Sequence, residues 1–127
     1  MILNFGHTFA HGFEGAKNFS KKINHGEAVL LGMMIASELS AKIKLLPFKE
    51  LLQIKSHYFN LKLPSNINKF FKKKEINKII YFMKKDKKNT NEKINIILLN
   101  KIGEVVPPKR LSFKVNEIKK FLNSYYL

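Results

Sequence analysis

The sequence predicts a mainly α-helical fold with a small β-hairpin near residues 93–106, in a single helical domain that covers residues 1–127. Apolar residues recur at helical spacing through most of the chain, whereas one late segment is β-branched and alternating. No internal repeat or low-complexity linker divides the 127 residues, a length that suits one compact domain.

The first two helices are predicted from apolar spacing and from their boundaries. Residues 6–16 place Phe9 and Phe13 four positions apart, as on one face of a helix. Residues 26–46 have an acidic residue in the first turn, almost no charge in the middle, and a boundary at Pro47. A helix that is apolar on all sides belongs in a domain interior.

The remaining elements follow from the same patterns. Helices are expected over residues 47–59, 74–85 and 115–122, with one helical turn near 66–71. The hairpin should pair the alternating run 94–98 with a strand near 103–106, and Pro107 and Pro108 should close it.

Composition narrows the classes of function. The net charge of +15 raises nucleic acid as a partner, but lysines occur in almost every segment and Arg110 is the only arginine. Solvated basic faces are therefore favoured over a nucleic-acid surface, and a non-catalytic module that binds RNA or an acidic partner is the alternative. Absence of cysteine excludes thiolate chemistry and fits a reducing, cytoplasmic location. The longest apolar run, residues 28–36, is too short to span a membrane, and no export signal is expected.

Three of the four histidines lie within 19 positions near the start of the chain. His7 and His11 share a helix face at roughly 6 Å between Cβ atoms, and neutral imidazole suits zinc, cobalt or iron. The spacing suggests His7 with His11 as a metal pair and His25 as a third donor, without deciding which two bind the ion. The alternative is that these are polar residues satisfied by ordinary hydrogen bonds. His57 stands apart and is assigned a structural role.

The surroundings of these histidines offer further candidate groups. Asn4 and Glu14 extend the same helix face by about one turn in either direction. His25 opens the next helix, where the dipole favours a neutral imidazole. Glu27 could orient a ligating imidazole or stabilise the first helical turn, and the second role is favoured.

Several motifs together resemble the C-terminal half of the 3-dehydroquinate synthase family. A lone pair of histidines four residues apart would be weak evidence, but the ordered set spans nearly the whole chain. It comprises Leu3-Asn4-Phe5-Gly6-His7-Thr8-Phe9, His11, His25-Gly26-Glu27-Ala28-Val29, Gly32-Met33, Met83, Asp86-Lys87-Lys88, Ile97-Leu98-Leu99 and Ile102-Gly103.

The resemblance implies an NAD- and metal-dependent carbon–oxygen lyase with a helical C-terminal domain. Such an enzyme converts 3-deoxy-D-arabino-heptulosonate 7-phosphate, a phosphorylated sugar acid, into 3-dehydroquinate and phosphate in the shikimate pathway to chorismate. The metal, zinc or cobalt, polarises the hydroxyl that is oxidised, and NAD carries the hydride.

The same resemblance assigns roles by position. It implies that His7 and His25 are the metal ligands, which reassigns the pair suggested by spacing. His11 and Asn4 would face the substrate and its phosphate, and Lys87 or its neighbour Lys88 would hold the substrate carboxylate. Ala10 departs from the glycine usual between the two family histidines.

The family's α/β NAD-binding domain would lie upstream of Met1, together with its glutamate metal ligand. No glycine-rich dinucleotide fingerprint occurs in these 127 residues. The resemblance therefore implies a portion of the enzyme that is inactive on its own, and a homodimer as its assembly. A half-enzyme that pairs with a separate NAD-domain chain, or another sugar-phosphate cyclase, are the remaining alternatives.

Overall fold

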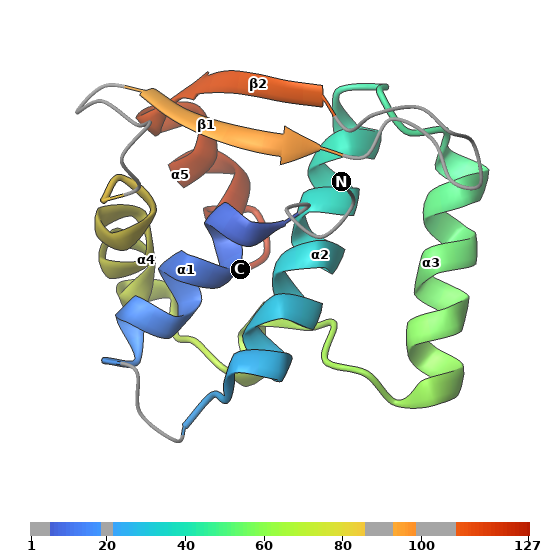
Figure 1. Ribbon diagram of the computed structural model, residues 1–127, viewed down its shortest axis with the longest axis horizontal. Helices are drawn as coiled ribbons and strands as arrows, with labels where there is room; N and C mark the ends of the chain where they lie inside the picture. The colour runs from blue at the N-terminus through green and yellow to red at the C-terminus, as the bar shows by residue number, and fades with distance from the viewer. Residues whose placement is uncertain (1–5, 19–21, 86–92, 99–108) are drawn as a thin grey trace.

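The computed structural model describes residues 6–18, 22–85, 93–98 and 109–127. Figure 1 shows the helices gathered beside a two-stranded ribbon. Their order is α1 (His7–Ala16), α2 (His25–Lys42), α3 (Phe48–Leu61), the 3₁₀ turns η2 (Ile67–Lys69) and η3 (Lys73–Glu75), α4 (Ile76–Met83), β1 (Lys93–Leu98), β2 (Lys109–Lys114) and α5 (Val115–Asn123). The mainly helical prediction with a small antiparallel sheet is confirmed.

The two strands form an antiparallel pair that differs in one respect from the predicted hairpin. Ile94 lies opposite Phe113, and Leu98 lies opposite Lys109. The strand expected at residues 103–106 lies outside the described residues. The partner of β1 is the later segment β2, for which no strand was expected. In β2 the apolar Leu111 and Phe113 alternate with polar neighbours, a short strand pattern that lies beyond Pro107 and Pro108, where the hairpin was expected to end.

The second helix ends earlier than predicted. It stops at Lys42, and Ile43 follows as its C-cap. Lys44 then adopts a left-handed conformation at φ 65°. The backbone N–H groups of Leu45 and Leu46 both donate to the carbonyl of Ser40. The chain therefore leaves α2 in a turn that lies before Pro47, whose steric restriction reaches only the preceding residue, Leu46.

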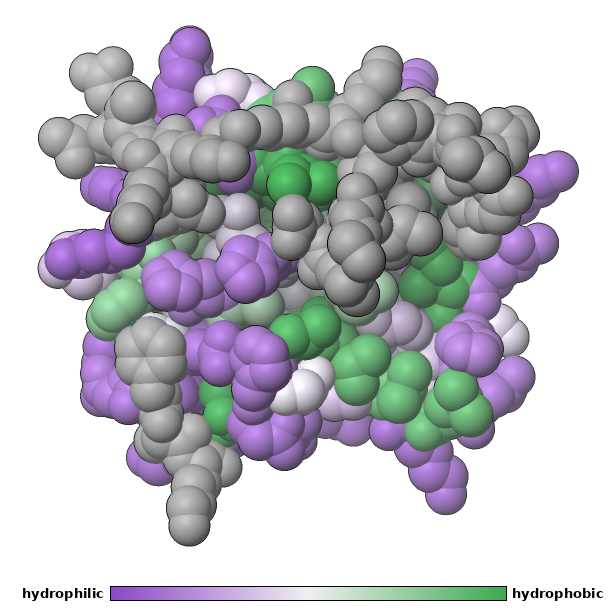
Figure 2. Space-filling view, in the orientation of Figure 1, coloured by the Kyte–Doolittle hydropathy of each residue, from purple (hydrophilic) through white to green (hydrophobic). Residues whose placement is uncertain are grey.

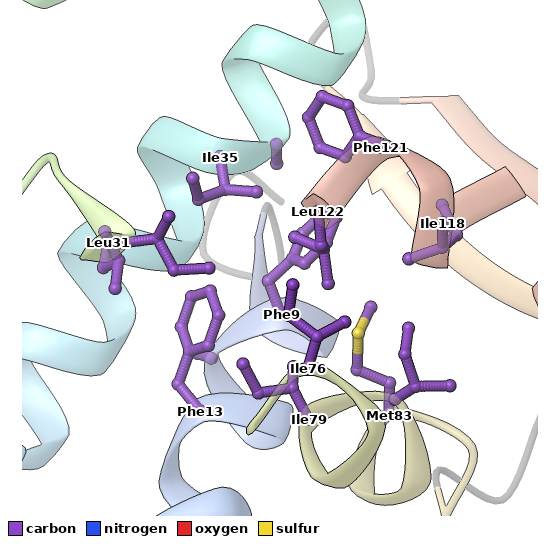
Figure 3. Packing of buried hydrophobic residues seen from close by; sticks show 14 of the residues in the cluster. Phe9, Phe13, Leu31, Ile35, Ile76, Ile79, Met83, Ile118, Phe121 and Leu122 are labelled. Carbon is purple, nitrogen blue, oxygen red and sulfur yellow. The ribbon is translucent and has the colours of Figure 1, made fainter. Parts of the chain in front are cut away.

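The core forms around α1, which lies between α2 and α4 (Figure 1). Phe9 and Phe13 are fully buried, and their ring centroids are 6.4 Å apart. Figure 3 shows these two rings surrounded by side chains from three other helices. The labelled neighbours are Leu31 and Ile35 of α2, Ile76, Ile79 and Met83 of α4, and Ile118, Phe121 and Leu122 of α5.

Glycines allow the backbones of α1 and α2 to approach each other closely. Gly6, which precedes α1, has φ 75°, and a Cβ placed on it would lie 2.7 Å from the carbonyl carbon of Gly32. A Cβ on Gly32 would in turn lie 2.6 Å from the carbonyl oxygen of Gly6 and 3.0 Å from the backbone nitrogen of Ala10. All three neighbours are backbone atoms, so they cannot move aside as the end of a side chain would.

We therefore expect Gly32→Ala to lower the free energy of unfolding by about 2 kcal/mol, because overpacking outweighs the gain in helix propensity. Gly26→Ala is the matched control on the same helix. Its Cβ would meet only the Asn24 Oδ1 atom at 3.5 Å, so the free energy of unfolding should rise by about 0.5–1 kcal/mol. Urea unfolding followed by far-UV circular dichroism checks both values. Equal effects of the two substitutions would contradict the close backbone contact.

The third helix stands at one edge of the molecule, with α2 as its main neighbour (Figure 1). Tyr58 anchors it, because its hydroxyl donates to the carbonyl oxygen of Leu30 at 2.7 Å, and burial raises the pKa of Tyr58 to about 12. Figure 2 shows hydrophobic side chains at the surface in this region, among mostly hydrophilic neighbours. The large apolar side chains of α3 that remain exposed are Phe48, Leu52, Phe59 and Leu61.

The second helix is apolar on most sides, as predicted, and its burial is confirmed by nine buried residues. It packs against helices of the domain and against β1. Within the described ranges, no helix combines the length and the apolar character needed to cross a bilayer.

Candidate metal and substrate site

The candidate site is built on the first helix and on the start of the second. His7, His11 and Glu14 follow one another at spacings of four and three residues, so they share one face of α1. Glu14 meets His25, the first residue of α2, at 3.1 Å between its Oε2 atom and the histidine Nδ1 atom. This contact shows that the histidine-bearing face of α1 is turned toward the start of α2.

The first turn of α1 is fixed by two contacts beside His7. Gly6 lies against the backbone of Gly32, as described above, and the Thr8 hydroxyl donates to the carbonyl oxygen of Asn95 on β1 at 3.2 Å. Thr8 is buried, whereas the side chain of His7 is exposed. The imidazole of His7 is therefore presented to the surface from a backbone that is held on two sides.

The far end of α1 is tied to η3 by an ion pair. The Lys17 ammonium lies 3.1 Å from the Glu75 carboxylate. Burial opposes ionisation of Glu75, but hydrogen bonds from the backbone N–H of Lys72 and from Lys17 outweigh it, so the pKa of Glu75 is lowered from its ordinary value. With both ends anchored, α1 holds its polar face in a defined orientation.

The start of α2 is closed by a capping box. The Asn24 side chain accepts a hydrogen bond from the Glu27 N–H at 2.7 Å, and the Glu27 carboxylate accepts one from the Asn24 N–H at 3.0 Å. Glu27 therefore stabilises the first turn, the role that the sequence favoured. The carboxylate that contacts His25 is Glu14. The sequence does not reveal this pairing, because it depends on how α1 packs against α2.

The other predicted site residues divide into two groups. His11 is half-buried on the same face as His7 and Glu14, and His57 is exposed on α3. Asn4, Lys87 and Lys88 lie outside the described residues. In the part of the chain that the structure describes, no three histidine, aspartate or glutamate side chains are close enough to hold a metal ion. The set of three imidazoles suggested by spacing is thus not assembled there.

The donor chemistry nevertheless fits a metal in part. His7 and His25 both present exposed imidazoles, the donors that zinc and cobalt accept. The carboxylate of Glu14 on one ring nitrogen of His25 is the arrangement often found behind ligating histidines. Two imidazoles are fewer than the three or four protein ligands of a usual zinc site, so the fit is partial.

Comparison with solved structures first defines the class of fold. The chain resembles 2-deoxy-scyllo-inosose synthase, solved with carbaglucose-6-phosphate, NAD+ and Co2+, at a TM-score of 0.66 and 22% sequence identity. The similarity covers 95% of this chain and 32% of that enzyme. A second structure of 2-deoxy-scyllo-inosose synthase gives a TM-score of 0.65. The fold of this chain is thus that of a helical portion, about a third, of 2-deoxy-scyllo-inosose synthase.

Residues 1–89 match the family model described as 3-dehydroquinate synthase C-terminal, and the chain belongs to this family. The 3-dehydroquinate synthase of Pelagibacter ubique is 50% identical over 95% of this chain. The 3-dehydroquinate synthases of a Bradyrhizobium species and of Coxiella burnetii are each 34% identical, over 85% and 97% of the chain. The chain spans about a third of the length of these relatives, 30–33%.

Proposed function

We propose that this chain is the metal- and substrate-binding part of a 3-dehydroquinate synthase. The reaction would convert 3-deoxy-D-arabino-heptulosonate 7-phosphate into 3-dehydroquinate and phosphate. The observation that carries the proposal is the placement of His7, His11 and Glu14 on one face of α1, turned toward His25, in a chain whose first 89 residues match the family.

In this proposal His7 and His25 hold a zinc or cobalt ion through one ring nitrogen each. Their backbones lie at the first residues of α1 and α2, and the anchoring contacts described above fix both positions. A divalent ion held by His7 and His25 would supply Lewis-acid polarisation of the hydroxyl to be oxidised, and NAD would supply the hydride chemistry.

The remaining proposed residues contact the substrate. His11 lies one helical turn after His7 on the same face, so its imidazole faces the same space and can hydrogen-bond a phosphate oxygen or a hydroxyl. Asn4 is proposed as a second contact at the phosphate end. Lys87, or its neighbour Lys88, would pair its ammonium with the substrate carboxylate.

The proposal is tested in a chimaera that adds the portion of the relatives that this chain does not span. The chain is joined to the upstream two thirds of the Pelagibacter ubique relative, and phosphate release from the heptulosonate phosphate is measured with NAD and Zn2+. We expect release by the chimaera and none detectable from the 127-residue chain by itself. Turnover by the 127-residue chain would contradict the view that it is one part of a larger site.

A second substrate distinguishes the cyclases from one another. Glucose 6-phosphate is the natural counterpart of the carbaglucose-6-phosphate in the similar structure. Phosphate release from glucose 6-phosphate, with none from the heptulosonate phosphate, would replace 3-dehydroquinate synthase by another sugar-phosphate cyclase. Addition of the upstream portion as a separate chain tests the half-enzyme alternative, because restored activity would show that a covalent link is unnecessary.

A further inference from the structure

The proposed function assigns no role of its own to Glu14, although this residue contacts His25. The Glu14 carboxylate lies 3.1 Å from the Nδ1 atom of His25, across the interface between α1 and α2. The Glu14 side chain is only 21% exposed, whereas the His25 side chain is 73% exposed. The Glu14 carboxylate is therefore mostly buried, whereas the His25 ring extends into solvent.

Both ends of this contact are held by the fold. Glu14 lies in the last turns of α1, between the buried residues Phe13 and Gly15. A Cβ on Gly15 would lie 2.2 Å from the Phe82 ring, so this part of α1 fits tightly against α4. His25 follows directly on the capping residue Asn24, whose bonds with Glu27 fix the start of α2. The carboxylate and the imidazole thus meet through short side chains on two fixed backbones.

We propose that Glu14 is a positioning residue for His25: its carboxylate accepts a hydrogen bond from Nδ1–H and leaves the lone pair of Nε2 directed outward toward a divalent metal. A carboxylate can only accept, so a neutral His25 satisfies it by carrying its proton on Nδ1. The ring then has one orientation and one tautomer, and its free nitrogen is the one that can ligate. The inference rests on the proposed ligand role of His25.

The tautomer provides a test that needs neither metal nor activity. The full chain, labelled with 15N, is studied by long-range 1H–15N NMR at mildly alkaline pH. A His25→Asn variant assigns the signals. We expect the His25 proton on Nδ1 in the unmodified chain and a shift toward Nε2–H in Glu14→Ala. Glu14→Gln, which keeps the length of the side chain, should give an intermediate distribution.

Glu117→Ala is the matched control, because it removes a carboxylate that caps the start of α5 and takes no part in holding His25. The His25 tautomer should not change in this variant. A proton on Nε2 in the unmodified chain, or an unchanged tautomer in Glu14→Ala, would overturn the positioning role. Circular dichroism spectra confirm that each variant retains its helices.

A cobalt titration separates this inference from the proposed function. If both hold, Glu14→Ala should weaken Co2+ binding by about 10- to 100-fold, the usual effect of removing a group that orients a ligand. A tautomer shift in Glu14→Ala with no change in Co2+ affinity would overturn the metal-directed role of Glu14. Unchanged Co2+ affinity in His25→Asn would overturn the ligand role of His25 itself, whatever the tautomer shows.

Discussion

In the chimaera with the Pelagibacter ubique portion, His25→Ala is expected to lower phosphate release by more than about 100-fold, because losing a ligand should cost at least as much as losing a group that orients one. The stoichiometry of bound metal should fall in parallel. The His25 side chain is 73% exposed, so its removal leaves the core intact and the loss would be one of function. Phosphate release and metal content per chain are the two measurements.

His57→Ala is the control for this experiment. His57 is also exposed, but it lies on α3, apart from the face of α1 that carries the candidate site. Its removal should leave both phosphate release and metal content unchanged. A His25→Ala chimaera that retains its full metal content would show that His25 is not a ligand.

The largest expected effect on stability comes from Phe13→Ala, which should lower the free energy of unfolding by about 3–5 kcal/mol. Phe13 is fully buried, and its ring centroid lies 5.2 Å from that of Phe71 and 6.4 Å from that of Phe9. Truncation removes these contacts and leaves a cavity between α1, α2 and α4 (Figure 3). Domains of this size are stable by about 5–15 kcal/mol, so much of the total would be lost.

Phe59→Ala provides the matched comparison, because the same side chain is 84% exposed on α3. Its effect should stay within about 0.5 kcal/mol. Chemical unfolding followed by circular dichroism measures both variants. A loss below about 1 kcal/mol for Phe13→Ala would contradict a close-packed core at this position.

The sequence predicted the helices well because their apolar spacing and their boundaries are local signals. The starts of α2 and α5 lie within one residue of the predicted positions. The second strand was harder, because Lys109–Lys114 contains only two apolar residues and forms a strand through its pairing with β1. Strand formation depends on the partner strand and on burial, which so short an alternating pattern does not reveal.

Part of the candidate site was also predictable from the sequence. Spacing correctly indicated that His7, His11 and Glu14 share a face, since this follows from helix geometry. The carboxylate partner of His25 could not be derived in the same way. Glu27 was the nearer candidate in sequence, but the helix start requires it as a cap, and the packing of α1 on α2 supplies Glu14 instead.

The glycines of α1 have a consequence for how the site is assembled. Gly12 and Gly15 lower the intrinsic helix propensity of this segment by about 2 kcal/mol relative to alanine. A Cβ on either glycine would collide with α4, so the same residues that weaken the isolated helix permit its tight docking. The helical conformation of α1 therefore depends on its packing against neighbouring helices. His7, His11 and Glu14 therefore share one face only while the whole domain is folded. Destabilising the domain should lower the metal affinity as well.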